Sequence, residues 1–363
     1  MRQRFWVLDV RNQVRQVIRK CMTCFRFIAE AEKFKMADLP EDRVNARNVF
    51  KNVGIDYCGP FFIKEKKFRN TTKIKIYVCV FVCMSVKAVH LEVVSDLTTE
   101  GFLGALRRFI ARRGTPVKIY SDNGTNFVGA KNQLKELYNL LNSDEHKHLV
   151  HNFTASHIPR ISWNFIPPLS PHQGGLWEST VKLFKHHLKR VVGESLFTYE
   201  VFTTFTTEVG GILNSRPLTQ MSSDPNDLNV LTPAHILIGE PIRNLPEQDY
   251  TDTPTNRLSF WEHITKMKQH FWARWHIEYL HELQKRHKWA KDTANIKVGE
   301  IVLLVEKNAP CTSWPLGRVI EVYPGADQVV RTAVVKTANG TYTRSVTLLC
   351  PLPFNDVTPV PNQ

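Results

Sequence analysis

The sequence lacks several features that would place it outside an ordinary reducing compartment. Its longest apolar run, residues 76–84, is about half of the roughly 20 residues that a membrane-spanning helix needs, so no membrane association is predicted. Met1 is followed by a mixed, charged stretch without the apolar core of a signal peptide, so secretion is not predicted. The 7 cysteines are an odd number and are scattered, which excludes a dense disulfide framework.

Acidic residues are also scarce relative to basic ones. The 363 residues include 48 Lys and Arg against 34 Asp and Glu, which gives a formal net charge of +14. This balance favours a polyanionic partner, although by itself it indicates only non-specific attraction to nucleic acid. Hydrophobic residues make up 42% of the chain, enough for a sizeable core and for more than one domain.

The spacing of apolar and turn residues divides the chain into segments. We predict a basic helical segment, a linker, an α/β domain, an irregular connection, a long aromatic-rich helix, a small β-barrel and a tail, over residues 1–36, 37–49, 50–220, 221–256, 257–292, 296–352 and 353–363. The α/β domain has the predicted element order β-β-β-α-β-α-β-α-α, with Thr98 as the cap of its first helix. This order indicates a mixed sheet with helices on both faces.

Three acids stand at the ends of separate predicted elements in the α/β domain: Asp56, Asp122 and Glu178. Each also fits an ordinary structural role, because Asp56 is suited to end a strand, Asp122 to a turn and Glu178 to the first turn of a helix. If the three lie together, each pair repels by about 4 kcal/mol at 4 Å and an effective dielectric of 20. Two Mg²⁺ or Mn²⁺ ions would offset this repulsion and would serve phosphodiester chemistry.

The predicted helix that begins near Glu178 carries a row of lysines. Lys182, Lys185 and Lys189 follow Glu178 at helical spacing, on the same face as that acid. The opposite face is apolar, with Val181, Phe184, Leu188 and Val192. A lysine row is usually a solvated face, but one that begins at a candidate catalytic acid favours contact with phosphates. His186 and His187, on the same helix, are expected to flank DNA or solvent.

These residues carry a family resemblance. Residues 54–56, 119–127 and 168–178 resemble the core of retroviral and retrotransposon integrases of the Asp-Asp-Glu type, which have a ribonuclease H-like fold. Three further words are similar to integrases of the BEL/Pao class of LTR retrotransposons: Leu213-Asn214-Ser215-Arg216-Pro217-Leu218-Thr219, Leu231-Thr232-Pro233-Ala234-His235 and Trp314-Pro315-Leu316-Gly317-Arg318-Val319. The resemblance covers nearly the whole chain, and it makes 50–220 the catalytic core.

The resemblance implies an enzyme that trims the 3′ ends of element DNA with water and then joins them to target DNA. It implies metal ligation by Asp56, Asp122 and Glu178, DNA contact by the helix face of Lys182 and Lys185, a homo-multimer, and a DNA-binding C-terminal barrel. Such a protein is expected to act in the nucleus, after passing through cytoplasmic element particles. Trp314 is expected in the core of the barrel.

Two departures from the family pattern bear on activity. Residues 123–177 separate the second and third acids, a longer interval than in many retroviral relatives and one that suits the retrotransposon class. Cys21 and Cys24 have the spacing of half a zinc site, but no histidine precedes them, since His90 is the first. Residues 1–36 are therefore expected to be a remnant of a zinc-binding domain, with Zn²⁺ bound only if a histidine pair lies upstream.

The incomplete zinc site leaves other interpretations open. The chain could be a fragment of a polyprotein or a decayed copy that binds DNA without catalysis. It could also be a host-adopted interaction module with the same fold. The intact acids favour an enzyme over such a module, because a module has no need of three costly carboxylates. Ribonuclease H activity is an alternative enzymatic function, but the words around Asp122 and Glu178 resemble integrases more.

Overall fold

The computed structural model describes residues 9–20, 41–44, 48–65, 72–141, 161–166, 175–193, 195–222, 224, 227–284, 295–306 and 308–352. For residues 19, 137–141, 175–180 and 183 it describes the backbone only. Cys21, Cys24, the tail 353–363 and the side chain of Glu178 thus lie outside the described part of the chain.

The chain divides into two units, residues 1–41 and 42–363. The first unit contains the basic helix α1 (Val10–Lys20), whose Val14 and Val17 side chains are exposed. Across the described ranges, we find no helix with the length and apolar composition that a membrane crossing requires. All of the following structure belongs to the second unit.

A mixed sheet of five strands forms the centre of the α/β domain. Its strands are β1 (Asn52–Lys64), β2 (Lys73–Cys83), β3 (Val89–Val94), β4 (Lys118–Ser121) and β5 (Ser162–Phe165). They lie in the order β3-β2-β1-β4-β5, with β1, β2 and β3 antiparallel and with β4 parallel to both β1 and β5. Three antiparallel strands followed by two parallel ones are the arrangement of the ribonuclease H-like fold, so the fold class expected from the sequence is confirmed.

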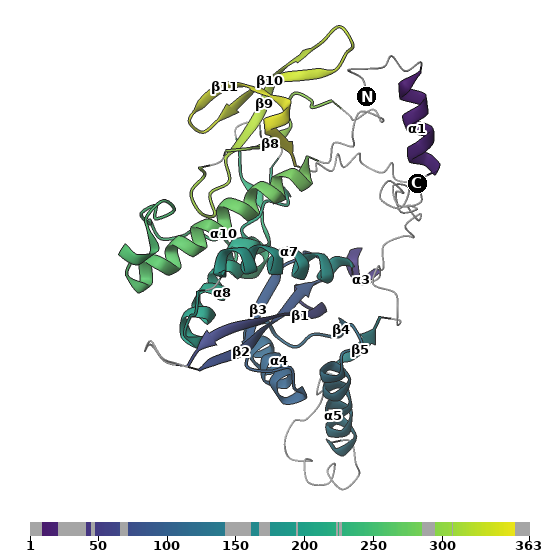
Figure 1. Ribbon diagram of the computed structural model, residues 1–363, viewed down its shortest axis with the longest axis vertical. Coiled ribbons are helices and arrows are strands. Elements are labelled where there is room, and N and C mark those ends of the chain that lie inside the picture. Colours follow the sequence, from purple (N-terminus) through teal and green to yellow (C-terminus); the bar gives the residue numbers. More distant parts are fainter. Residues whose placement is uncertain are drawn as a thin grey trace. The chain divides into compact units, whose positions relative to one another are not determined.

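Helices cover both faces of this sheet (Figure 1). On one face lie α4 (Thr99–Arg113) and α5 (Thr125–Leu141), and on the other α7 (Gly175–Val192) and α8 (Tyr199–Asn214). The strands alternate between the two cores: Ile55 packs with Phe102 under α4, and Cys58 packs with Phe184 under α7. Thr98 caps α4 as predicted, because its hydroxyl accepts a hydrogen bond from the Gly101 N–H at 3.0 Å.

The connection between the α/β domain and the long helix contains more regular structure than expected. A short strand pair, β6 (Thr219–Gln220) and β7 (Val230–Leu231), precedes the helix α9 (Pro233–Ile238). A capping box between Thr232 and His235 begins α9. Most of the Leu-Thr-Pro-Ala-His motif therefore forms the N-terminus of α9.

The long helix, α10 (Phe260–Leu283), packs on α7 and α8 through a buried face that includes Phe271 and Trp275. After it come β8 (Ile301–Leu304), β9 (Leu316–Pro324), β10 (Val330–Thr337), β11 (Gly340–Ser345) and β12 (Leu349–Pro351). These strands form an antiparallel sheet in the order β11-β10-β9-β8-β12. A small β domain after a long helix is the architecture that the sequence predicts.

Candidate active site

Asp56 lies within β1, and Asp122 directly follows the neighbouring parallel strand β4. The pairing of β1 with β4 runs from Asn52 opposite Lys118 to Gly54 opposite Tyr120. Asp56 and Asp122 each come two residues after the last pair. Because side chains alternate along a strand, Asp56 faces the same side of the sheet as Cys58. Cys58 packs in the core beneath α7, so Asp56 is directed to the α7 face. Asp122 is exposed in the turn past the end of β4.

The turn after β4 fixes the backbone at Asp122. The buried Ser121 hydroxyl accepts from the Trp163 indole N–H at 2.9 Å and donates to the Asp122 carbonyl at 3.0 Å. The Gly124 N–H then donates to Asp122 Oδ1 at 3.0 Å. A Cβ at position 124 would stand only 3.1 Å from that Oδ1 atom, so glycine lets the turn close on the carboxylate.

Asp56 is half-buried, and its Oδ1 accepts from the Tyr57 N–H at 2.6 Å. Its charge reaches the neighbouring thiol of Cys58. Burial raises the pKa of Cys58 to about 12, with Asp56 adding to the rise and Lys185 and Lys189 opposing it. The charges of Asp56 on β1 and of Lys185 and Lys189 on α7 therefore all act on the same buried thiol.

Helix α7 supplies the remaining predicted site residues. Glu178 lies in its first turn, and the side chain of Glu178 is outside the described residues. Lys182 and Lys189 are exposed and Lys185 is half-buried. The predicted apolar stripe is confirmed, because Val181, Phe184, Leu188 and Val192 are all buried. The lysines therefore line the outer side of a helix whose inner side packs on the sheet.

The carboxylate triad as a metal site stays a prediction. Among the described side chains, which include Asp56 and Asp122 but not Glu178, no group of three or more His, Cys, Asp or Glu residues is arranged to hold a metal ion. Asp56 lies within β1 and not at a strand end as expected, and Asp122 lies just past the end of β4. Glu178 is placed only by the backbone of its helix. Cys21 and Cys24 are likewise untested.

His187 does not flank DNA or solvent as we expected. It is buried, with its Nε2 2.6 Å from Oε2 of Glu278 on α10, and its ring packs against Phe271. Burial lowers the pKa of His187, while the Glu278 carboxylate raises it. The helical spacing of the apolar stripe could have indicated this, since His187 lies between Phe184 and Leu188 on the inward side.

Trp314 packs on buried residues of the C-terminal sheet, as expected, and also on the long helix. Its ring packs edge-on against Trp272 and Tyr279 of α10, and its indole N–H donates to the Ser215 hydroxyl at 3.2 Å. The Tyr279 hydroxyl in turn donates to the Pro217 carbonyl. Two of the family words, 213–219 and 314–319, therefore meet at a junction with the long helix. Sequence alone places these words in separate domains and gives no signal that they touch.

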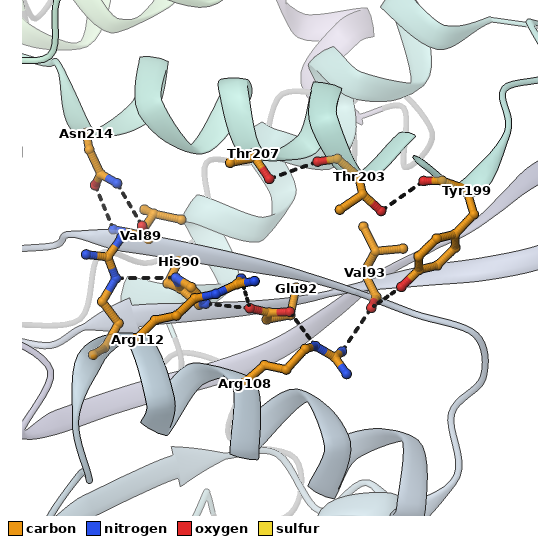
Figure 2. Close-up of polar contacts among 11 residues, drawn as sticks. Val89, His90, Glu92, Val93, Arg108, Arg112, Tyr199, Thr203, Thr207 and Asn214 are labelled. Carbon is orange, nitrogen blue, oxygen red and sulfur yellow. Dashed lines mark hydrogen bonds and ion pairs between the residues drawn. The ribbon is translucent and has the colours of Figure 1, made fainter. Parts of the chain in front are cut away.

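The motif at residues 213–219 also holds the edge strand β3 of the sheet in place (Figure 2). Asn214 accepts from the Val89 N–H and donates to the Val89 carbonyl, both at 2.8 Å. Further along β3, the buried Glu92 carboxylate binds Arg108 at 2.7 Å, Arg112 at 2.7 Å and His90 at 2.9 Å. These contacts hold β3 between α8 and α4, where β2 is its one sheet neighbour among the described strands.

One polar cluster near the acids was missed altogether. Lys118 and Tyr120 precede Asp122 at alternate positions of β4, and both bind the carboxylate of Asp42. The alternation of Lys118 and Tyr120 is a signal that these two side chains share a face. Nothing in the sequence indicated that Asp42, in the predicted linker, would join them.

Comparison with known proteins gives a match to one family model and similarities to solved structures. The model of a family of unknown function, DUF5641, matches residues 259–352, which are α10 and the C-terminal sheet. No curated protein matches the chain. Among solved structures, a chain in the cryoEM structure of the simian T-cell lymphotropic virus intasome in complex with PP2A regulatory subunit B56 gamma is similar, with 13% identity and a TM-score of 0.34. That match covers 95% of this chain and 91% of that chain.

Proposed function

We propose that this protein is an integrase, a metal-dependent polynucleotidyl transferase that processes DNA 3′ ends and joins them to target DNA. The observation that supports this most is the matching position of Asp56 and Asp122. Each lies two residues past the last paired position of β1 and β4, and Asp56 is directed to the face covered by α7, the helix that carries Glu178. The motifs at residues 213–219, 231–235 and 314–319 support the BEL/Pao retrotransposon class.

The donor set suits hard divalent cations. Asp56 and Asp122 offer carboxylate oxygens, the ligands that Mg²⁺ and Mn²⁺ prefer, and Glu178 would add a third. Such ions, when bound, would supply Lewis-acid chemistry to an in-line displacement at phosphorus. The protein's own part is to hold the carboxylates: the Gly124 N–H orients Asp122, and the Tyr57 N–H orients Asp56.

The attacking group in this proposal comes from water or from a DNA 3′ hydroxyl rather than from the protein. Cys58 is the nucleophilic side chain nearest to Asp56 along the strand, but its pKa of about 12 keeps the thiol protonated near neutral pH. Lys182 and Lys189, which are exposed, would contact the phosphates of bound DNA. The formal net charge of +14 supports such binding.

We further propose that residues 50–220 act as the catalytic core, that the C-terminal sheet binds DNA, and that the protein works as a homo-multimer in the nucleus. Zn²⁺ binding by Cys21 and Cys24 would require a histidine pair from outside this sequence. These parts of the proposal follow from the family resemblance of the sequence words.

The test is the substitution Asp122→Asn, assayed with Mg²⁺ or Mn²⁺ for nicking and for strand joining. We expect joining to fall by at least about a thousandfold, because the substitution removes a metal-binding charge. DNA affinity should stay within about twofold, because the lysines are unchanged. Glu100→Gln, which removes an exposed acid on α4, is the matched control and should leave joining intact. Joining by Asp122→Asn at the wild-type rate would refute the assignment.

A further inference from the structure

The carboxylate of Asp42 lies in a set of three donors on the sheet. Asp42 belongs to the short helix α3 (Glu41–Val44), which precedes the α/β sheet. Its Oδ1 accepts from Asn52 Nδ2 at 2.9 Å and from Lys118 Nζ at 3.0 Å. Its Oδ2 accepts from Lys118 Nζ at 2.9 Å and from the Tyr120 hydroxyl.

These donors continue the row that contains the candidate catalytic acids. Asn52 pairs with Lys118, Gly54 pairs with Tyr120, and Asp56 and Asp122 come at the next step of the two strands. Alternation places those of these positions that lie within the strands on one face of the sheet. Two residues of a strand span about 7 Å, so the donor set begins roughly 7 Å from the acids. The separation between adjacent phosphates of a DNA strand is of the same order.

The chemistry of the three donors suits a phosphate. A lysine ammonium, a phenol O–H and an amide N–H₂ all donate, and together they carry one positive charge. The Tyr120 hydroxyl already donates to the Asp42 carboxylate in the structure. The pKa of Asp42 is lowered by hydrogen bonds from Tyr120, Lys118 and Asn52, which outweigh its partial burial. Asp42 is therefore an anion at neutral pH, held where another anion would fit.

The site can be reached from solvent. The Lys118 side chain is 40% exposed although its ammonium is paired, and the Asp42 side chain is 19% exposed. Solvent screens an ion pair with this exposure and weakens it relative to a fully buried pair. A DNA phosphate can compete with such a carboxylate, because the ammonium keeps an anionic partner throughout the exchange.

We propose that Asn52, Lys118 and Tyr120 form a binding subsite for a backbone phosphate of DNA, and that Asp42 occupies this subsite as an internal competitor until DNA displaces it. The identity of the ligand as DNA rests on the proposed function. The subsite itself rests on the donor geometry. Asp42 would thus weaken DNA binding in the resting protein and release the preceding segment when DNA is bound.

The experiment measures the affinity of the full chain for a fluorescent DNA duplex over a series of salt concentrations. We expect Asp42→Asn to tighten binding about fivefold at low salt, because it removes the competing charge. It should leave the slope of log affinity against log salt nearly unchanged, because the wild-type chain makes the same phosphate contact once DNA has displaced Asp42. Glu41→Gln removes the same charge from the adjacent exposed residue and is expected to change affinity by less than about twofold.

Second-site substitutions test whether the gain passes through the subsite. In the Asp42→Asn background, Lys118→Ala should abolish the gain in affinity and reduce the slope by about 0.9, the value for one lost phosphate contact. Tyr120→Phe, which removes only the hydroxyl, should abolish part of the gain. An equal effect of Asp42→Asn and Glu41→Gln would overturn the proposal, since net charge alone would explain it. A lower unfolding midpoint for Asp42→Asn without tighter binding would also overturn it, and would leave Asp42 as a structural tether.

The outcome of this binding experiment can be distinguished from the outcome of the strand-joining test of the proposed function. If Asp42→Asn tightens DNA binding through Lys118 while the wild-type chain joins no DNA, the subsite stands and the enzymatic proposal fails. If joining is present and depends on Asp122 but Asp42→Asn leaves affinity unchanged, the enzymatic proposal stands and the subsite is refuted.

Discussion

Replacement of Asn214 by alanine should release the edge strand β3 from the body of the α/β domain. Asn214 is buried, with 4% of its surface exposed, and its amide group makes two hydrogen bonds of 2.8 Å to the backbone of Val89 (Figure 2). The Val89 side chain is also buried, so alanine at 214 leaves a backbone N–H and a carbonyl without their partner away from water.

The magnitude follows from the number of groups left unsatisfied. An unpaired buried polar group costs about 1–3 kcal/mol, so the two groups at Val89 together cost roughly 3 kcal/mol if part of the loss is relieved by relaxation. Because 1.4 kcal/mol corresponds to a factor of ten, the local opening of β3 should become about a hundredfold more frequent.

Hydrogen–deuterium exchange of the full chain measures this opening directly. Amides of residues 89–94 should exchange about a hundredfold faster in Asn214→Ala, while those of the C-terminal sheet stay at the wild-type rate. Asn229→Ala replaces an exposed asparagine and is the matched control. Exchange of residues 89–94 within about twofold of the wild type would refute the reasoning, because it would mean that the Val89 backbone is secured by something other than Asn214.

Two further predictions concern Glu92 and Trp314. Glu92→Gln should lower the free energy of unfolding in urea by about 1–2 kcal/mol. The loss is modest because Arg108 and Arg112 are 43% and 60% exposed, so water hydrates their guanidinium groups in the variant. The folded protein lowers the pKa of Glu92, so the contribution of Glu92 to the free energy of unfolding is present above the ordinary glutamate pKa of about 4.3 and is lost as pH falls below it. The same decrease of unfolding free energy at acid pH in Glu92→Gln as in the wild type would contradict this. Trp314→Ala should cost about 2–3 kcal/mol and speed proteolysis between α10 and the C-terminal sheet, whereas Trp261→Ala, on the exposed start of α10, should not.

The sequence was most informative where local chemistry and periodicity act alone. The order of strands and helices, the Thr98 cap and the buried stripe of α7 were all predicted, because each depends on residues close together in the chain. Asp122 was expected at a strand end and directly follows β4, whereas Asp56 lies within β1, which continues to Lys64.

The sequence was least informative where distant segments meet. Trp314 was expected in the barrel and its packing on α10 was not, because nothing local distinguishes a tryptophan that packs only on its own sheet from one that also packs on α10. His187 was misplaced for the same reason, since its partner Glu278 lies far along the chain. Asp42 was taken for part of a linker, because a single carboxylate in a polar stretch carries no signal of the lysine and tyrosine that bind it.

The central claim is that Asp56, Asp122 and Glu178 act together in one metal-dependent strand-joining site. The most direct measurement is the joining of a pre-processed DNA end to a target duplex by Asp56→Asn and Glu178→Gln, each compared with the wild type in Mg²⁺ and in Mn²⁺. We predict that each substitution alone lowers the joining rate by at least about a thousandfold while DNA affinity is retained. Wild-type joining by either variant would contradict the account, because the carboxylate concerned could not then belong to the site.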